Sequence, residues 1–195
     1  MVTIDKIESN DGIEIFSDGT IVYNYEEAKE VIGKLKAKKY AVSDCILLML
    51  YAQSDKPIFG RVLLVKEVFL LIKEILNEED TQDAKFIPYR LGMYSFTVGN
   101  ALVNLEYSGY IERKGKKNAK LEQFELTDKG KKYVSEIWNT LPKIIQDITK
   151  EKRKGWDQLG YDGILRLVYR KYPEYREKSC LKERYKTITW GKGVG

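Results

Sequence analysis

The pattern of apolar and polar residues predicts a β-hairpin followed by a helix at the start of the chain. Residues 13–16 and 20–23 are rich in β-forming side chains. They flank Asp18 and Gly19, a pair that favours a tight two-residue turn. Apolar side chains then recur at helical spacing in a segment that begins after Asn24, which can act as its N-cap.

Three stretches with helical apolar spacing follow. The first, residues 45–52, is almost wholly apolar and follows Ser43, a predicted N-cap. The second, residues 59–76, has a wide apolar stripe interrupted by charged residues. The third, residues 94–108, follows a loop at residues 86–92 that contains proline and glycine. We expect these three helices to pack together in a core.

A second β-hairpin comes next in the pattern. Residues 110–113 face residues 124–126 across a basic, polar tip at residues 114–120. Thr127 then caps a further helix, which Pro142 interrupts or kinks.

The C-terminal part of the chain is helical and basic. Residues 143–179 are expected to hold two helices, separated by the basic run 150–154 and Gly155, and the last fifteen residues look loosely ordered. The predicted organisation is an N-terminal β-hairpin and helix at 1–40, a core at 41–142 and a basic helical extension at 143–195.

This order of elements is typical of a winged helix-turn-helix core. The predicted fold class is therefore mainly α with small β-hairpins. In such a fold the third helix can enter the major groove of DNA, while basic side chains on the wing reach phosphates. The candidate DNA-binding residues are Ser95, Thr97, Asn100 and Asn104 on the third helix, and Arg113, Lys114, Lys116, Lys117 and Lys120 on the wing.

The C-terminal extension offers a different surface, suited to a protein partner. Tyrosine and arginine are enriched in interface hot spots. The candidate partner-binding residues are Arg166, Tyr169, Arg170, Tyr172 and Tyr175. The other interpretation of these side chains is that the tail packs onto the core.

Composition narrows the classes of function. The 195 residues are 43% hydrophobic and 32% charged, which is typical of a globular chain, and no apolar run reaches the length of a membrane span. Histidine is absent, which removes the commonest general base and metal ligand, and no phosphate-binding loop or dinucleotide fingerprint is present. We expect a cytoplasmic protein with no catalytic residues, no metal and no cofactor, hence not an enzyme. Cys45 and Cys180 have neither disulfide nor zinc spacing.

Charge is unevenly distributed around a net value of +5. Residues 1–30 carry eight acids and two bases, whereas residues 143–195 carry fourteen bases and seven acids. This asymmetry predicts a polarised surface, although ordinary solvated faces would give the same counts.

Three motifs lie within the predicted core. Residues 61–71 are RVLLVKEVFLL, residues 86–95 are FIPYRLGMYS, and residues 126–130 are LTDKG. These motifs resemble those of the YwgA-like and Panacea-related winged-helix proteins of prokaryotes and phages, a group of largely unassigned function. The resemblance covers about residues 43–132, together with residues 169–175 in the tail. It implies a regulator or an antitoxin-like interaction module without established catalytic residues.

Lys66 and Glu67 stand out inside the first of these motifs. They could form an internal polar contact used by the family. The preferred interpretation is a snorkelling lysine beside a surface glutamate.

These observations favour a DNA-binding transcriptional regulator that works as a homodimer on double-stranded DNA. The alternative is a protein-interaction module, antitoxin-like or an assembly adaptor, with no catalytic activity. Many winged helices bind proteins through the same surfaces, and a basic hairpin can be only a solvated loop.

Overall fold

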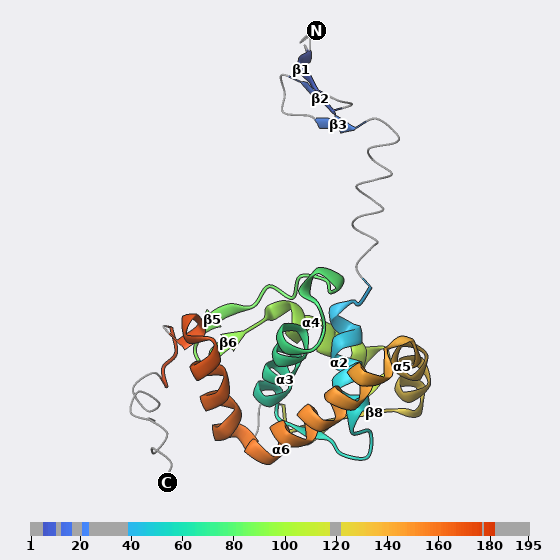
Figure 1. Ribbon diagram of the computed structural model, residues 1–195, viewed down its shortest axis with the longest axis vertical. Coiled ribbons are helices and arrows are strands. Elements are labelled where there is room, and N and C mark those ends of the chain that lie inside the picture. Colours follow the sequence, from blue (N-terminus) through green and yellow to red (C-terminus); the bar gives the residue numbers. More distant parts are fainter. Residues whose placement is uncertain are drawn as a thin grey trace. The chain divides into compact units, whose positions relative to one another are not determined.

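The computed structural model describes two compact units of the chain, residues 1–39 and residues 40–195. Figure 1 shows their elements. The described residues are 6–10, 13–16 and 21–23 for the backbone, and 39–117, 122–176 and 178–181 for backbone and side chains.

The first unit contains a small antiparallel sheet. Its strands, in the spatial order β1-β2-β3, are β1 (Lys6–Asn10), β2 (Ile13–Phe16) and β3 (Ile21–Tyr23). The pairing of β2 with β3 confirms the predicted hairpin, whereas strand β1 was not predicted. The turn expected at Asp18 and Gly19 and the helix expected after Asn24 lie outside the described residues.

The second unit is mainly helical, as predicted. Its longer helices are α2 (Val42–Ala52), α3 (Arg61–Glu74), α4 (Phe96–Tyr107), α5 (Asp128–Thr140) and α6 (Lys143–Lys171), and its 3-10 helices are η1 (Glu78–Asp80) and η2 (Pro173–Arg176).

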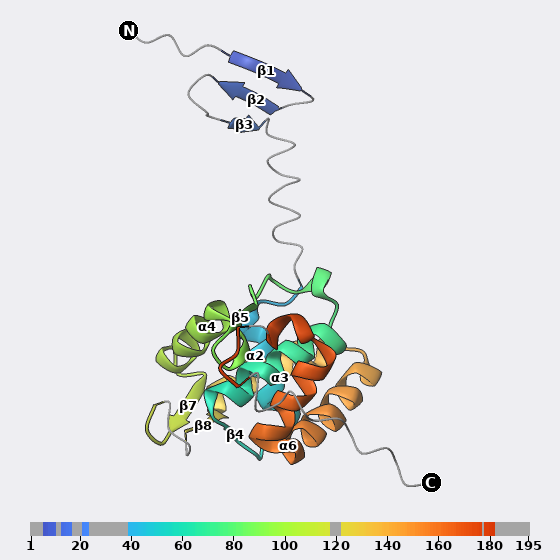
Figure 2. The same ribbon diagram turned by 90° about the vertical axis from the view of Figure 1, so that its left-hand side faces the viewer.

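A small antiparallel sheet joins these helices. Its strands, in the spatial order β4-β8-β7, are β4 (Ile58–Phe59), β8 (Gln123–Leu126) and β7 (Ile111–Lys114). The β7–β8 hairpin confirms the predicted pairing, with Ile111 opposite Leu126. Strand β4 was not predicted, because two residues are too few to give a periodic signal. Figure 2 shows β7 beside α4, and the two elements are in contact.

A second hairpin replaces the loop expected at residues 86–92. Strands β5 (Ile87–Tyr89) and β6 (Gly92–Tyr94) pair antiparallel. Gly92 has φ +83, a backbone conformation that favours glycine, and a side chain there would collide with the ring of Tyr169. A proline is compatible with a short edge strand. Pro88 was therefore a misleading sign of a loop at residues 86–92.

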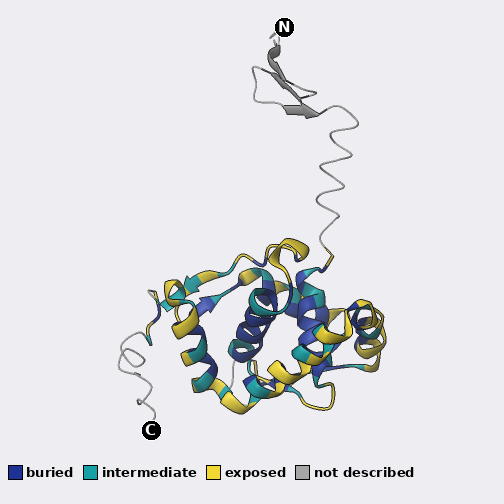
Figure 3. Cartoon of the chain, viewed as in Figure 1, coloured by how far each residue is buried: buried dark blue, intermediate teal, exposed yellow. Residues whose placement is uncertain are grey.

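Helices α2 and α3 form the centre of the core. Figure 3 shows both as largely buried, and α2 packs against α3, α4, α5 and α6. The predicted cap of α2 at Ser43 is wrong. The N-cap is Ala41, whose backbone N–H donates to the Asp44 carboxylate at 2.9 Å, so the helix starts one turn before its continuous apolar run.

Helix α6 extends through the position where a break was expected. The basic run 150–154 and Gly155 lie inside the helix, because lysine, arginine and glutamate are good helix formers. The break falls at Gly160, where φ is 60° and ψ is −168°. Its first part packs on the core in the same compact unit as α2 and α3.

Candidate nucleic-acid interface

Helix α4 begins at Ser95, which is a buried N-cap. Ser95 Oγ accepts a hydrogen bond from the Val98 backbone N–H at 3.0 Å, and its hydroxyl donates to the carbonyl of Ala84. These contacts leave Ser95 0% exposed. The expectation that Ser95 faces solvent and approaches a base edge is therefore wrong, since capping α4 and anchoring the preceding loop hold its hydroxyl inside the protein.

The other predicted polar residues of α4 lie together on its surface. Asn100 and Asn104 are exposed and Thr97 is half-buried. All three line a shallow hollow of about 410 Å³. Their amide and hydroxyl groups can therefore reach a ligand placed along this face of the helix.

The same helix carries large exposed apolar side chains. Phe96 is 54% exposed, Val103 41% and Tyr107 94%. Helix α4 contains no lysine or arginine. Any positive charge near α4 therefore comes from neighbouring elements.

The cations of the β7–β8 hairpin fall into two groups. Arg113 Nε donates to Glu106 Oε1 at 2.9 Å, and Lys114 Nζ lies 2.7 Å from Glu125 Oε1. The hydrogen bond between Lys114 and Glu125 is the main cause of the raised pKa of Lys114. Lys116 and Lys117 are exposed at the tip, and Lys120 lies outside the described residues.

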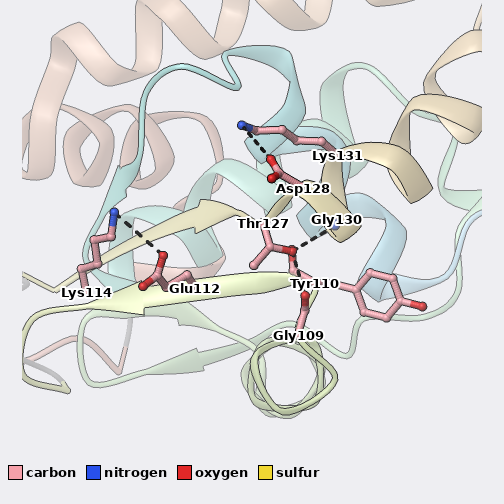
Figure 4. A network of polar contacts seen from close by, with 8 residues as sticks. All are labelled: Gly109, Tyr110, Glu112, Lys114, Thr127, Asp128, Gly130 and Lys131. Carbon is pink, nitrogen blue, oxygen red and sulfur yellow. Dashed lines mark hydrogen bonds and ion pairs between the residues drawn. The ribbon is translucent and has the colours of Figure 1, made fainter.

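Thr127 fixes the hairpin to both neighbouring helices. Its Oγ1 accepts a hydrogen bond from the Gly130 N–H at 3.1 Å and donates to the Gly109 carbonyl at 2.7 Å (Figure 4). Lys129 Nζ donates to the Ser108 carbonyl at 2.8 Å. The end of α4, the start of β7 and the start of α5 are thus held together, so the hairpin keeps a defined position beside α4.

The tyrosines of the C-terminal extension pack onto the core. The Tyr169 side chain is 3% exposed and its hydroxyl lies 2.6 Å from Ser179 Oγ. The rings of Tyr172 and Tyr175 lie 4.7 and 5.3 Å from the ring of Phe69 in α3. Burial removes Tyr169 from a partner-binding surface. The ring contacts of the half-buried Tyr172 and Tyr175 agree with the other interpretation, in which the tail packs onto the core. Of the five residues, Arg166 and Arg170 remain exposed.

Lys66 is a buried lysine, not a snorkelling one. It is 1% exposed, and its Nζ donates to the carbonyls of Leu91 and Met93 at 2.9 and 3.1 Å. Burial lowers the pKa of Lys66 to about 7. Its hydrogen bonds tie the β5–β6 hairpin to α3.

Glu67 is also buried, which corrects the expectation of a surface glutamate. Its side chain is 0% exposed and forms an ion pair with Arg153, which is likewise 0% exposed. Burial raises the pKa of Glu67 to about 7, and the positive charge of Arg153 opposes that rise. Arg153 forms a second ion pair with Asp157. The internal polar contact considered for the family motif is therefore present, and its partner is on α6.

A cavity of about 1170 Å³ lies at the N-terminal end of α3. The turn between β5 and β6 and the break in α6 also line it. Arg61 and Glu122, whose charged groups approach to 4.0 Å, contribute its charged inner wall. The cavity is not predictable from the sequence, because its wall comes from segments that are distant in the chain.

Metal-binding clusters and membrane-spanning helices were both sought among the described residues. Among them, no group of three histidine, cysteine, aspartate or glutamate side chains is placed to hold a metal ion. Cys45 and Cys180 are both free. None of the helices in this part of the chain combines the length and apolar character needed to cross a membrane.

No family model matches the chain, and no curated protein matches it.

Proposed function

We propose that the second unit contains a winged helix that binds double-stranded DNA, with α4 as the recognition helix and the β7–β8 hairpin as the wing. The observation that carries this proposal is the sheet order β4-β8-β7 combined with the chain order α2, β4, α3, β5, β6, α4, β7, β8, in which the β5–β6 hairpin is inserted between α3 and α4. In a winged helix, a strand after the first helix joins the wing hairpin in this way, and the third helix precedes the wing.

The surface of α4 supports a role in base contact. Asn100 and Asn104 are exposed on one hollowed face. Asparagine can form a bidentate contact with adenine in the major groove. The rigid attachment of the hairpin through Thr127 keeps the wing at a fixed position relative to that face.

The wing supplies phosphate contacts through its tip. Because Arg113 and Lys114 already pair with Glu106 and Glu125, we assign DNA contact to Lys116 and Lys117 within the described part of the wing. We therefore assign phosphate binding to the tip lysines first, ahead of the two paired cations.

The test is a salt titration of duplex binding, followed by fluorescence anisotropy. The double variant Lys116→Ala/Lys117→Ala should bind more weakly, and its log–log salt slope should be smaller by about 2, because each phosphate contact contributes about 0.9. The matched control is Lys152→Ala/Lys154→Ala, two exposed lysines on α6. An equal change in both double variants would refute a wing-specific contact.

A protein-interaction module is the second candidate, and one observation favours it. The exposed apolar residues Phe96, Val103 and Tyr107 share α4 with no basic residue. Exposed apolar side chains of this kind suit a protein partner, including a second copy of the chain. The variant Val103→Ser/Tyr107→Ser separates the candidates: loss of self-association in light scattering with intact DNA binding assigns this face to a protein contact. If the parent chain binds no duplex, the protein-interaction function replaces DNA binding.

A further inference from the structure

The cavity beside α3 has buried polar groups whose hydrogen-bonding capacity is unused. The Glu122 side chain is 1% exposed, and neither of its carboxylate oxygens has a hydrogen-bond partner within the described chain. The same holds for Nε and Nη2 of Arg61, while Arg61 Nη2 lies 4.0 Å from Glu122 Oε1. Buried groups of this kind normally have a hydrogen-bond partner, because a group left unpaired keeps an uncompensated desolvation cost. A pair of acceptors and a pair of donors thus stand side by side in the cavity wall.

Aromatic side chains surround the same cavity. Phe59 from β4, Tyr89 from β5 and Tyr161 from α6 all line it, and they are 54%, 40% and 44% exposed. Large rings at such exposure on three separate elements offer flat apolar faces to a ligand. A ligand with a planar ring can therefore stack on these side chains inside the cavity.

The start of α3 leaves open space above the charged pair. Gly60, with φ +82, is the N-cap and provides no side-chain cap, and nothing lies within 4 Å of the position that a Cβ would take. Gly60 also donates its N–H to the Glu122 carbonyl at 2.7 Å, which fixes the glutamate backbone beside the helix. Apart from its chain neighbours Phe59 and Arg61, Gly60 therefore has no close neighbour on the side where a Cβ would lie.

We propose that this cavity binds a guanine base, a planar ring that carries an oxygen acceptor next to two N–H donors. The Glu122 carboxylate accepts the two adjacent N–H groups, and Arg61 donates to the exocyclic carbonyl oxygen of the base. The surrounding aromatic side chains stack on the base. Adenine does not fit this arrangement, because its ring nitrogen acceptor would face the carboxylate.

The proposal goes beyond DNA binding and does not rest on it. A free guanine nucleoside and a guanine within a single-stranded nucleic acid share the chemistry that the cavity recognises. The cavity is formed by different residues from the outward face of α4 and the wing tip. Its occupancy can therefore be measured without any duplex.

The experiment is isothermal titration of the full chain with guanosine and with adenosine. Guanosine should bind at least about tenfold more tightly than adenosine, because a site built for hydrogen bonds rejects a ligand that leaves them unmade. Glu122→Gln should weaken guanosine binding at least about tenfold, since one acceptor is replaced by a donor. The matched control is Glu125→Gln in the adjoining strand β8, which should leave the affinity unchanged.

Variants at the cavity rim keep the test informative if Glu122→Gln does not fold. Tyr89→Ala and Phe59→Ala each remove an exposed ring and should weaken guanosine binding, whereas Tyr107→Ala, 94% exposed on α4, should not. A guanine-containing tetranucleotide run in parallel distinguishes the two sources of the base. Binding of the tetranucleotide alone assigns the cavity to nucleic acid, and binding of guanosine assigns it to a free nucleoside. The absence of binding by both probes, or equal affinity for guanosine and adenosine, overturns the proposal.

Discussion

Arg153 in α6 reaches Glu67 in α3 with its Nε 3.0 Å from Glu67 Oε2, and both side chains are fully buried. This ion pair joins the long C-terminal helix to the centre of the core. The pair explains why α6, a helix rich in basic residues, packs in the same compact unit as α2 and α3. A buried charge without its partner carries a large desolvation cost, so each residue of the pair depends on the other.

The first prediction follows from that dependence. Arg153→Met should lower the free energy of unfolding by about 3–5 kcal/mol at pH 8, because it leaves the Glu67 carboxylate buried and unpaired. Urea denaturation measures the change. The control is Lys143→Met, which removes the exposed ion pair with Asp147 and should cost less than about 0.5 kcal/mol. Similar losses in the two variants would contradict a structural role for the buried pair.

The second prediction concerns pH. The pKa of Glu67 is raised from 4.5 to about 7, so the folded protein holds a proton that the unfolded chain releases in that window. The contribution of Glu67 to stability is therefore complete below pH 4.5 and is lost as the pH rises to about 7.

Lys66 acts in the opposite direction and in a higher window. Its pKa is lowered from 10.5 to about 7, so the unfolded chain holds the extra proton between these values, and stability rises with pH there. The measurement is the free energy of unfolding from pH 5 to pH 10. Relative to the parent chain, Glu67→Gln should reduce the change in this free energy below pH 7. Lys66→Met should reduce the change above pH 7. Parallel curves for parent and variants would count against both assignments.

The third prediction uses two glycines with opposite surroundings. A Cβ at Gly130 would lie 2.0 Å from the Tyr110 carbonyl oxygen, so Gly130→Ala should destabilise the fold by about 3 kcal/mol. Gly155, within α6, has nothing within 4 Å of such a Cβ. Gly155→Ala should instead stabilise the fold by about 0.5–1 kcal/mol, because glycine is a poor helix former. Thermal unfolding of both variants checks the sign of each change.

Local signals were sufficient for much of the fold. Thr127 followed by Gly130 predicted the cap of α5, and the structure adds the reason for that glycine, which is the close approach of the Tyr110 carbonyl. The alternating residues of β7 and β8 predicted their pairing. These features depend on neighbours in sequence, so the sequence pattern contains them.

Features that depend on distant partners could not be predicted in the same way. Lys66 and Glu67 looked like surface charges, because their partners Leu91, Met93 and Arg153 lie far along the chain. The sequence analysis placed the helix break at the basic run 150–154 and Gly155, whereas the non-helical residue in the structure is Gly160. The cavity wall also depends on distant partners, because Arg61 and Glu122 lie far apart in the sequence.

The last prediction concerns Asn100, which lies exposed on α4 with Asn104 and Thr97 around the same hollow. If α4 enters the major groove, the Asn100 amide can donate to one atom of adenine and accept from another, a pairing worth about 1–3 kcal/mol of discrimination. Tip lysines add affinity without regard to sequence, so the two effects are separable. Asn100→Ala should therefore lose about 5- to 150-fold in preference for a selected duplex over a random one, while nonspecific affinity stays nearly unchanged. Competition binding with both duplexes measures this ratio, and Asn139→Ala, an exposed asparagine on α5, is the matched control. If Asn100→Ala keeps the full ratio of the parent chain, Asn100 does not contact a base, and its exposed amide serves the protein-interaction surface of α4 instead.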